Sequence, residues 1–448
     1  MKRTLIHNAT IVNEHTRKQG SLVLQDGRIE EILTDGRPLL SPCDEIIDAT
    51  GCLLLPGAID DHVHFREPGL THKADILSES RAAVAGGVTS VMDMPNTVPQ
   101  TTTLKALEYK QALFRQKCLA NHSCYFGATH DNFELFPQLD KKRVCGIKLF
   151  LGSSTGNMLV DDDNALRRIF EGTDMLIAAH CEDQRIIDEN IAKLRAADGP
   201  DSDYSILRHR LIRSAKACNS ATRKAVLLAR KTGARLHVLH VSTAKELTMF
   251  TGDRWNEKKR ITAEACVGHL MFDNEDVRRL GACIKCNPAI KLRPDRDALR
   301  EAINTDRVDV IATDHAPHLL TEKAGGALRA ASGMPSIQFS LVSMLQLVEE
   351  GCFTVETLVE KMCHNPARMF HIEGRGFIRE GYNADLVLVR KEPWTVTKDV
   401  IQSKCGWSPF EGMTFDWKVE TTFVNGHKAY DKGVVDESKR GEPLWFYA

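Results

Sequence analysis

Residues 58–69 read Ala58-Ile59-Asp60-Asp61-His62-Val63-His64-Phe65-Arg66-Glu67-Pro68-Gly69, and they follow directly on an apolar run. In an extended strand, residues i and i+2 point to the same side, so His62 and His64 can reach one cation. Neutral imidazole is a common zinc ligand. In a chain with 17 histidines, an isolated pair of this kind is equally compatible with a hydrogen-bonded surface pair, so its meaning depends on the rest of the chain.

The chain from about residue 52 onward alternates short apolar runs with amphipathic segments of helical length. Segments 74–85, 221–232 and 337–350 are examples of the helical pattern. Eight apolar runs have the length and composition of strands: 53–60, 88–94, 123–128, 146–150, 175–179, 236–240, 261–266 and 308–313. This alternation predicts an α/β fold, a closed (β/α)8 TIM barrel, whose reactive residues gather at the carboxyl ends of the strands.

Polar and ionisable residues occupy those strand ends. They are His62 and His64 after the first run, Asn96 after the second, Lys148 within the fourth, His180 after the fifth, His240 at the end of the sixth and Asp314 after the eighth. Taken singly, each histidine could be a packed core or rim residue, and Asp314 could cap a loop. Four histidines at the same ends of barrel strands are hard to explain by packing, so we predict a metal site there.

The two ends of the chain have a different rhythm from the middle. Near the amino terminus, with Asp26-Gly27 as a hairpin turn, the strand-like segments are 4–12, 21–24, 28–32 and 46–55. Near the carboxyl terminus they are 384–390 and 420–430, the latter with Asn425-Gly426 as a turn. We expect both ends to combine into one small β-sandwich. The predicted division is a composite β-sandwich domain, residues 1–55 plus 375–448, and a barrel domain, residues 56–374.

Composition and charge exclude several classes of partner. The 448 residues carry 59 Lys plus Arg against 60 Asp plus Glu, and this net charge of -1 gives no reason to expect nucleic acid or a membrane surface as a partner. No run of about 18 uncharged apolar residues occurs in the sequence. Thirteen scattered cysteines are typical of small buried hydrophobes in a reducing compartment. We therefore expect a cytoplasmic protein, large enough for one barrel and an added module.

Lys148 is the unusual member of the predicted metal site. A free ammonium group would repel metal cations, and its burial beside them would be costly. If CO2 adds to the amine, the product is a carbamate with two anionic oxygens, which can bridge two metals. The residues alone favour the ordinary alternative, an unmodified lysine that is solvated or paired with a carboxylate.

Five motifs in this order resemble the cyclic amidohydrolase superfamily, and within it the dihydroorotase family, over nearly the whole chain. They are Pro56-Gly57-Ala58-Ile59-Asp60, His62-Val63-His64-Phe65-Arg66-Glu67-Pro68-Gly69, Met94-Pro95-Asn96-Thr97, Gly146-Ile147-Lys148-Leu149-Phe150 and Thr313-Asp314-His315-Ala316-Pro317-His318. The resemblance implies a small-molecule substrate and the reversible hydrolysis of the cyclic amide of (S)-dihydroorotate to N-carbamoyl-L-aspartate, a step of pyrimidine synthesis. It also allows a homodimer, or an association with aspartate transcarbamoylase.

The resemblance further implies a centre of two zinc ions, with a hydroxide between them and with Lys148 carboxylated by CO2. The ligands of one ion would be His62, His64, Lys148 and Asp314. Those of the other would be Lys148, His180 and His240. Asp314 would also be the catalytic residue that moves the proton. The family's substrate contacts carry over onto Arg66, Asn96, Asn287 and His318.

Arg66 separates the members of the superfamily. A guanidinium offers a planar pair of donors to a carboxylate, and dihydroorotate has a ring carboxylate that dihydropyrimidines and hydantoins lack. The alternative is a rim arginine paired with Glu67. For the function, the open alternatives are a dihydropyrimidinase or hydantoinase, an allantoinase-like enzyme, and a non-catalytic scaffold subunit.

Gly268 departs from the family pattern, which often has a histidine there, so we expect the adjacent His269 to shape the pocket wall and not to bind metal.

Overall fold

Eight parallel strands form the barrel sheet, in the order β13-β12-β11-β10-β9-β8-β7-β6. The computed structural model describes residues 3–34, 37, 39, 41–152, 158–199 and 203–447. The barrel strands are β6 (Ala58–Val63), β7 (Val88–Asp93), β8 (Asn121–Gly127), β9 (Val144–Phe150), β10 (Ile177–His180), β11 (Leu236–Val238), β12 (Ile261–Cys266) and β13 (Val310–Ala312). The barrel closes where Val63 bridges His315 in parallel and His64 N donates to His315 O at 2.8 Å. The predicted (β/α)8 barrel is confirmed.

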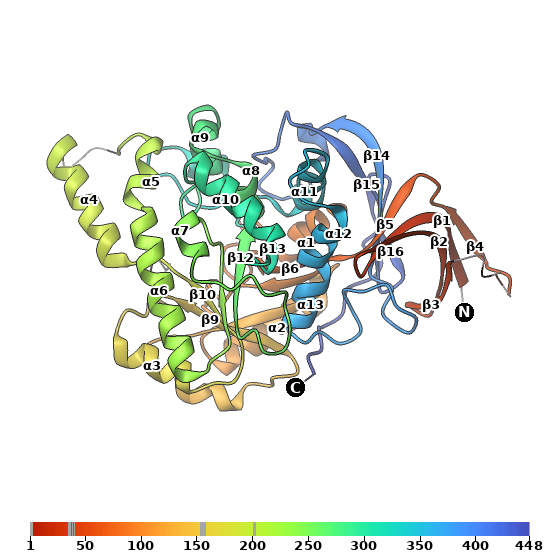
Figure 1. The fold of residues 1–448 in the computed structure, drawn as a ribbon, viewed down its shortest axis with the longest axis horizontal. Helices are drawn as coiled ribbons and strands as arrows, with labels where there is room; N and C mark the ends of the chain where they lie inside the picture. The colour runs from red at the N-terminus through yellow and green to blue at the C-terminus, as the bar shows by residue number, and fades with distance from the viewer. Residues whose placement is uncertain are drawn as a thin grey trace.

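Strands from both ends of the chain form a second sheet, which lies to the right of the barrel in Figure 1. Its nine strands are β1 (Arg3–Asn13), β2 (Thr16–Gln25), β3 (Arg28–Thr34), β4 (Glu45–Asp48), β5 (Cys52–Pro56), β14 (Leu386–Thr395), β15 (Thr414–Val424), β16 (His427–Asp431) and β17 (Val434–Val435). Strand β5 joins the two halves, since it pairs in parallel with β1 and antiparallel with β14. Ile11, Leu54 and Phe423, from these halves, belong to one buried cluster. The predicted union of the two termini in one small β-structure beside the barrel is confirmed, and its strands form a single nine-stranded sheet.

Two hairpin turns of this sheet lie where the sequence predicts them. Asp26 and Gly27 have φ of 54° and 79°, and Asn425 and Gly426 have φ of 49° and 73°. Two consecutive residues with positive φ are typical of the tight turn that suits a twisted hairpin. The predicted strand 46–55 is instead two strands, β4 and β5. We retain the division into residues 1–55 plus 375–448 and residues 56–374 as a proposal.

The barrel begins later in the chain than the sequence prediction placed it. The apolar run 53–60 contains most of β5, in the terminal sheet, and the start of β6, the first barrel strand. Gly57 lies between these strands, and a Cβ atom there would come within 2.1 Å of Thr89 Oγ1. A glycine is required at this close approach, and the chain changes sheets there. His62 consequently lies inside β6 and not after it.

Helices cover the outside of the barrel (Figure 1). The α-helices are α1 (Ile76–Ala85), α2 (Leu104–Lys117), α3 (Asp163–Glu171), α4 (Gln184–Asp198), α5 (His209–Ile212), α6 (Ala215–Thr232), α7 (Ala244–Leu247), α8 (Val267–Met271), α9 (Asn274–Leu280), α10 (Arg293–Asn304), α11 (Ser340–Glu349), α12 (Val355–Val359) and α13 (Asn365–Met369). Helix α1 begins where Asp75 caps it by accepting a hydrogen bond from Ser78 N at 2.9 Å. Among the described residues, no helix is long and apolar enough to cross a lipid bilayer.

Candidate active site

One cavity at the carboxyl ends of the barrel strands is lined by every residue that the sequence predicts for the site. Its volume is about 630 Å3. The ten predicted residues on its wall are His62, His64, Arg66, Asn96, Lys148, His180, His240, Asn287, Asp314 and His318. They come from β6, β9 and β10 and from the loops that follow other barrel strands. The fold brings these side chains together, while the role of each stays a prediction.

His62 and His64 direct their Nε2 atoms at the same oxygen of Asp314. The distances to Asp314 Oδ1 are 3.2 Å from His62 and 3.1 Å from His64. Their Nδ1 atoms face other acceptors, Glu264 Oε1 at 2.9 Å and Asn96 Oδ1 at 2.8 Å. The single proton of each neutral imidazole therefore belongs on Nδ1, and each Nε2 lone pair faces a carboxylate oxygen. Electron-pair donors that converge with no proton between them form a site for a cation.

His180 and His240 form a second pair of converging imidazoles. His180 Nδ1 lies 3.0 Å from His240 Nε2. His180 Nε2 lies 2.9 Å from Glu182 Oε2, which Arg213 also binds. Because the carboxylate takes the His180 proton on Nε2, the Nδ1 lone pair is left for a cation. The buried Nδ1 of His240 has no hydrogen-bond partner among the described residues.

The donor set fits a divalent metal of the zinc type. His62, His240 and Asp314 place ligand atoms within 4.8 Å of one another. Imidazole nitrogen together with carboxylate oxygen is a combination that zinc accepts, whereas calcium and magnesium prefer oxygen donors alone. The four converging histidines, His62, His64, His180 and His240, therefore favour a transition metal or zinc over calcium or magnesium.

Lys148 lies in β9 on the wall of this cavity, with only 1% of its surface exposed. Its Nζ lies 4.6 Å from the centre of the Phe150 ring, and within the described part of the chain it makes no hydrogen bond or ion pair. Burial lowers the pKa of Lys148 to about 8, although Asp314 and Glu264 act to raise it. A buried amine of lowered pKa is more often neutral, and the neutral amine is the form that adds CO2.

Three residues of the cavity have left-handed backbone conformations. The φ angles are 67° at Arg66, 37° at His240 and 48° at Asp314. A residue other than glycine costs about 1–3 kcal/mol in this region, and such residues cluster at functional sites. The fold therefore holds these three side chains in the cavity despite local strain.

Arg66 and His318 lie together on the cavity wall. Arg66 Nε donates to Pro317 O at 3.0 Å, and Nη2 lies 3.0 Å from His318 Nε2. The arginine is buried, with 7% of its surface exposed. Glu67 is bound instead by Lys117, on α2. The alternative of a rim pair between Arg66 and Glu67 is therefore wrong.

Glu264 is a residue of this region that the sequence analysis did not assign. Its Oε1 atom accepts from His62 Nδ1 and also from the backbone N of His240 at 2.8 Å. Its Oε2 atom lies 3.8 Å from His237 Nε2, which lies 3.2 Å from Asp61 Oδ2. One carboxylate thus holds residues from two barrel strands. The sequence signal that could have identified Glu264 is its charge within an otherwise uncharged strand, residues 261–266, which is buried.

Two histidines support the part of the cavity near Asn287, and one of them, His209, was not predicted from the sequence. His209 lines the cavity, and its Nε2 atom lies 3.1 Å from Asn287 Oδ1. His269 is absent from the cavity lining, but its Nε2–H donates to Pro288 O at 2.9 Å. His269 is therefore not on the pocket wall itself, where the sequence analysis expected it, and acts on the wall only by holding the segment that carries Asn287.

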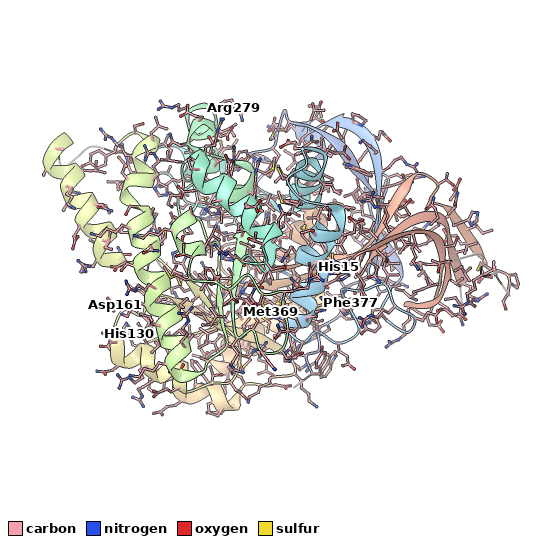
Figure 2. All side chains as sticks on the ribbon, in the orientation of Figure 1. His15, His130, Asp161, Arg279, Met369 and Phe377 are labelled. Carbon is pink, nitrogen blue, oxygen red and sulfur yellow. The ribbon has the colours of Figure 1, made fainter. Side chains whose placement is uncertain are left out.

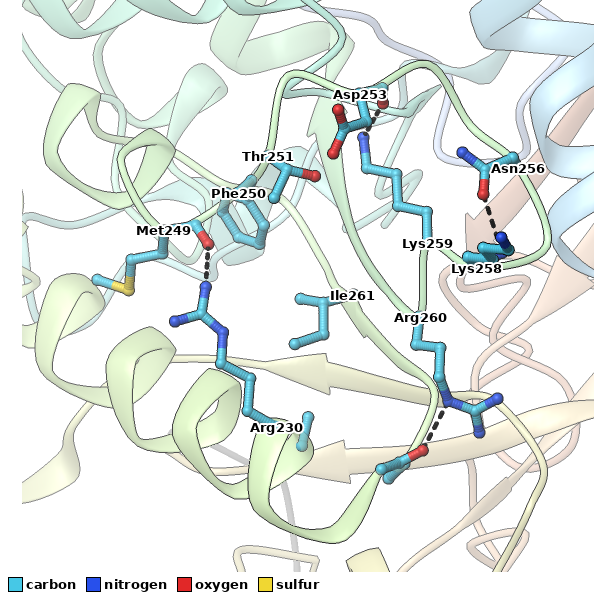
Figure 3. A pocket seen from close by; sticks show the side chains of 13 residues that line it. Arg230, Met249, Phe250, Thr251, Asp253, Asn256, Lys258, Lys259, Arg260 and Ile261 are labelled. Carbon is cyan, nitrogen blue, oxygen red and sulfur yellow. Dashed lines mark hydrogen bonds between the residues drawn. The ribbon is translucent and has the colours of Figure 1, made fainter.

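A second cavity lies at the opposite end of the barrel, where α6 ends and β12 begins (Figure 3). Its volume is about 360 Å3, and none of the ten predicted residues lines it. Arg260, on its wall, donates to the backbone oxygen of Gly233 at 2.6 Å. His130, labelled in Figure 2, also lies outside the candidate site, 3.7 Å from Asp161. The chemistry predicted from the sequence is thus confined to the first cavity.

Known proteins resemble this chain in both sequence and structure. The amidohydrolase family model matches residues 53–429. A dihydroorotase of Halobacterium salinarum is 35% identical over 434 residues, which are 92% of this chain and 96% of that protein. An allantoinase of Bacillus velezensis is 28% identical over 97% of this chain and 95% of that protein. The solved structure of an L-hydantoinase (dihydropyrimidinase) from Arthrobacter aurescens has a TM-score of 0.90 at 26% identity, with 97% of this chain and 98% of that chain covered.

Proposed function

The chain belongs to the amidohydrolase family, and we propose that it hydrolyses the cyclic amide of (S)-dihydroorotate, reversibly, to N-carbamoyl-L-aspartate. The observation that carries this proposal is the buried Arg66 beside His318, on the wall of the cavity that also contains the four converging histidines. A guanidinium enclosed in a cavity suits a ligand with a carboxylate. Dihydroorotate has such a group, whereas the neutral hydantoin and dihydropyrimidine rings lack one.

The proposed metal centre holds two zinc ions. The ligands would be His62, His64, Lys148 and Asp314 for one ion, and Lys148, His180 and His240 for the other. Bound zinc would lower the pKa of a coordinated water from about 15.7 towards about 7 and polarise the carbonyl under attack. The Lys148 amine, buried and without an ion-pair partner among the described residues, would serve as a ligand after CO2 converts it to an anionic carbamate.

The remaining steps belong to the chain's own residues. Asp314 would accept the proton of the attacking water and return it to the ring nitrogen as the amide bond breaks. Its carboxylate lies beside both His62 and His64, and with metal bound by these histidines it would lie next to the reacting atoms. Arg66 and His318 would hold the ring carboxylate, while Asn96 and Asn287 would orient the ring from the other parts of the wall.

The test is an assay of the full-length protein with dihydroorotate and, for the reverse direction, N-carbamoyl-aspartate. We expect turnover in both directions, loss of activity when a chelator removes the metal, and recovery when zinc is returned. The metal content of the same sample should approach two ions per chain. A metal-loaded protein that converts neither compound would contradict the proposed reaction and would favour a scaffold role.

A second candidate, a hydantoinase or dihydropyrimidinase, is supported by the similarity to the Arthrobacter enzyme, and the allantoinase relative adds a third ring chemistry. Activity on hydantoin, dihydrouracil or allantoin in the absence of activity on dihydroorotate would favour these. A role in pyrimidine synthesis, a cytoplasmic location, a homodimer and an association with aspartate transcarbamoylase remain predictions that follow from the first candidate.

A further inference from the structure

The imidazole of His318 lies between two cationic side chains. Lys73 Nζ is 3.1 Å from its Nδ1 atom, and Arg66 Nη2 is 3.0 Å from its Nε2 atom. A third group, the backbone oxygen of Ser332, is also 3.1 Å from Nε2. Lys73 precedes α1 and was not among the residues that the sequence predicts for the site.

These three contacts cannot all be hydrogen bonds at once. Lysine and arginine only donate, a carbonyl only accepts, and a neutral imidazole has one N–H and one lone pair. Burial lowers the pKa of His318 to about 2, and the charges of Arg66 and Lys73 add to this effect, so the ring is neutral. With the proton on Nε2, the contacts to Lys73 and Ser332 are both hydrogen bonds. With the proton on Nδ1, only the contact to Arg66 is a hydrogen bond, and the Nδ1–H group points at the Lys73 ammonium.

Glu322 fixes the lysine in its position next to the ring. Its Oε1 atom lies 2.6 Å from Lys73 Nζ, and its Oε2 atom accepts from the backbone N of Leu319 at 2.9 Å. The Lys73 side chain is 14% exposed, so the ammonium is largely removed from water. A held ammonium 3.1 Å from Nδ1 favours a lone pair on that nitrogen and therefore the Nε2–H tautomer of His318.

In this tautomer, Arg66 Nη2 has no acceptor on His318. Arg66 Nη1 also has no hydrogen-bond partner in the described part of the chain, and only Nε is occupied, by Pro317 O. The guanidinium and the Nε2–H group are then neighbouring donors on the cavity wall, and a ligand oxygen would share the Nε2–H proton with Ser332 O or take it from that carbonyl. An anion with two oxygens is the ligand that satisfies both.

We propose that Lys73 is a positioning residue for substrate recognition: it holds His318 in the Nε2–H tautomer, so that His318 and Arg66 both donate to the ring carboxylate of the substrate. The carboxylate part of this inference rests on the proposed function. The tautomer part does not, because it concerns contacts within the protein alone.

The first experiment measures the tautomer without substrate. The full-length metal-loaded protein, labelled with 15N in its histidine rings, is studied by NMR, and the His318 signals are those lost in His318→Asn. We expect a protonated Nε2 and an unprotonated Nδ1. In Lys73→Met, no ammonium faces Nδ1 and Glu322 Oε2 lies 3.6 Å from it, while Arg66 still faces Nε2, so we expect the proton to move to Nδ1. A wild-type protein with the proton on Nδ1, or a Lys73→Met variant with an unchanged tautomer, would overturn the inference.

The second experiment measures kcat and KM for dihydroorotate. Loss of a hydrogen bond to a charged group predicts a KM that rises about tenfold or more in Lys73→Met, with a smaller change in kcat because the carboxylate lies away from the reacting amide. Lys73→Arg, which keeps a cationic donor, should recover most of the loss. Lys141→Met is the matched control, since Lys141 pairs with Asp174 on the exposed surface.

The two claims can fail separately. If the wild-type protein does not turn over dihydroorotate, the proposed function fails, while the NMR measurement still decides whether Lys73 sets the tautomer. If dihydroorotate is turned over but Lys73→Met leaves KM unchanged, the inference about substrate recognition is wrong. If Lys73→Met loses its metal or no longer folds, as its NMR spectrum would show, Glu322→Gln replaces it as the test variant. This substitution weakens the ion pair that holds the Lys73 ammonium, so it should also raise KM.

Discussion

Replacement of Arg66 by methionine removes the guanidinium from the cavity and keeps a side chain that can fill part of its volume. Arg66 is 7% exposed, and its Nε atom donates to Pro317 O. The substitution leaves the predicted metal ligands in place, so we expect metal content to stay the same. What changes is the environment of the substrate carboxylate, which would lie in a partly dry cavity beside His318 with one charged partner missing.

The size of the effect follows from the number of donors that are lost. Hydrogen bonds to charged groups contribute about 1.5–3 kcal/mol each, and the guanidinium has two terminal nitrogens, Nη1 and Nη2, that can face the two oxygens of a carboxylate. Loss of both gives about 3–6 kcal/mol, which corresponds to a fall in kcat/KM of about 10²–10⁴-fold. Since the carboxylate is bound in both the ground state and the transition state, most of the loss should be a rise in KM.

Steady-state kinetics with dihydroorotate, on samples of equal metal content, measure this loss. The matched control is Arg185→Met, which removes an arginine whose ion pair with Glu189 lies on the exposed surface of α4. We expect the control to behave like the wild-type protein. A kcat/KM for Arg66→Met within threefold of the wild-type value would refute carboxylate recognition by this residue.

Three further substitutions test the metal centre and the proton transfer. Asp314→Asn should retain most of the metal and reduce kcat by about 10²-fold or more, because the amide cannot carry the proton; near-normal turnover would exclude that role. Lys148→Ala should lose the two-metal centre, as measured by metal analysis, and short carboxylic acids should partly restore activity; a full complement of two metals in this variant would exclude the carbamate bridge. Glu264→Gln replaces the carboxylate that accepts from His62 Nδ1–H with a neutral amide. Metal affinity, measured by competition titration with a chelating dye, should weaken by about 10–100-fold. An unchanged affinity would show that His62 needs no such partner.

The barrel and the terminal sheet were predictable because their strands are separated by clear turn or helix signals. Asp26-Gly27 and Asn425-Gly426 are turns that two residues specify locally, and both occur as predicted. The junction at Gly57 was not predictable in the same way, since the residues on both sides of it, from Leu53 to Ile59, are apolar. Only contact with Thr89, in another strand, requires the glycine and divides the run between two sheets.

The predicted site residues meet in one cavity because the carboxyl ends of parallel barrel strands meet at one end of the barrel. The supporting residues were not predicted, since their partners are distant in the sequence. Glu264 contacts His62, and Lys73 contacts His318. The two members of each pair are far apart in the sequence. Neither pairing has a local pattern from which it could be read. The environment of Lys148 was not predictable for the same reason, because its burial without an ion-pair partner among the described residues is a property of the fold and not of its own segment.

The most direct test of the account is the ratio of kcat/KM for dihydroorotate to that for dihydrouracil, measured on one sample of the metal-loaded wild-type protein. The two rings differ by the carboxylate that Arg66 and His318 are proposed to bind. The account predicts a preference of about 100-fold or more for dihydroorotate, from the same charged hydrogen bonds. A ratio near one, or a preference for dihydrouracil, would contradict it.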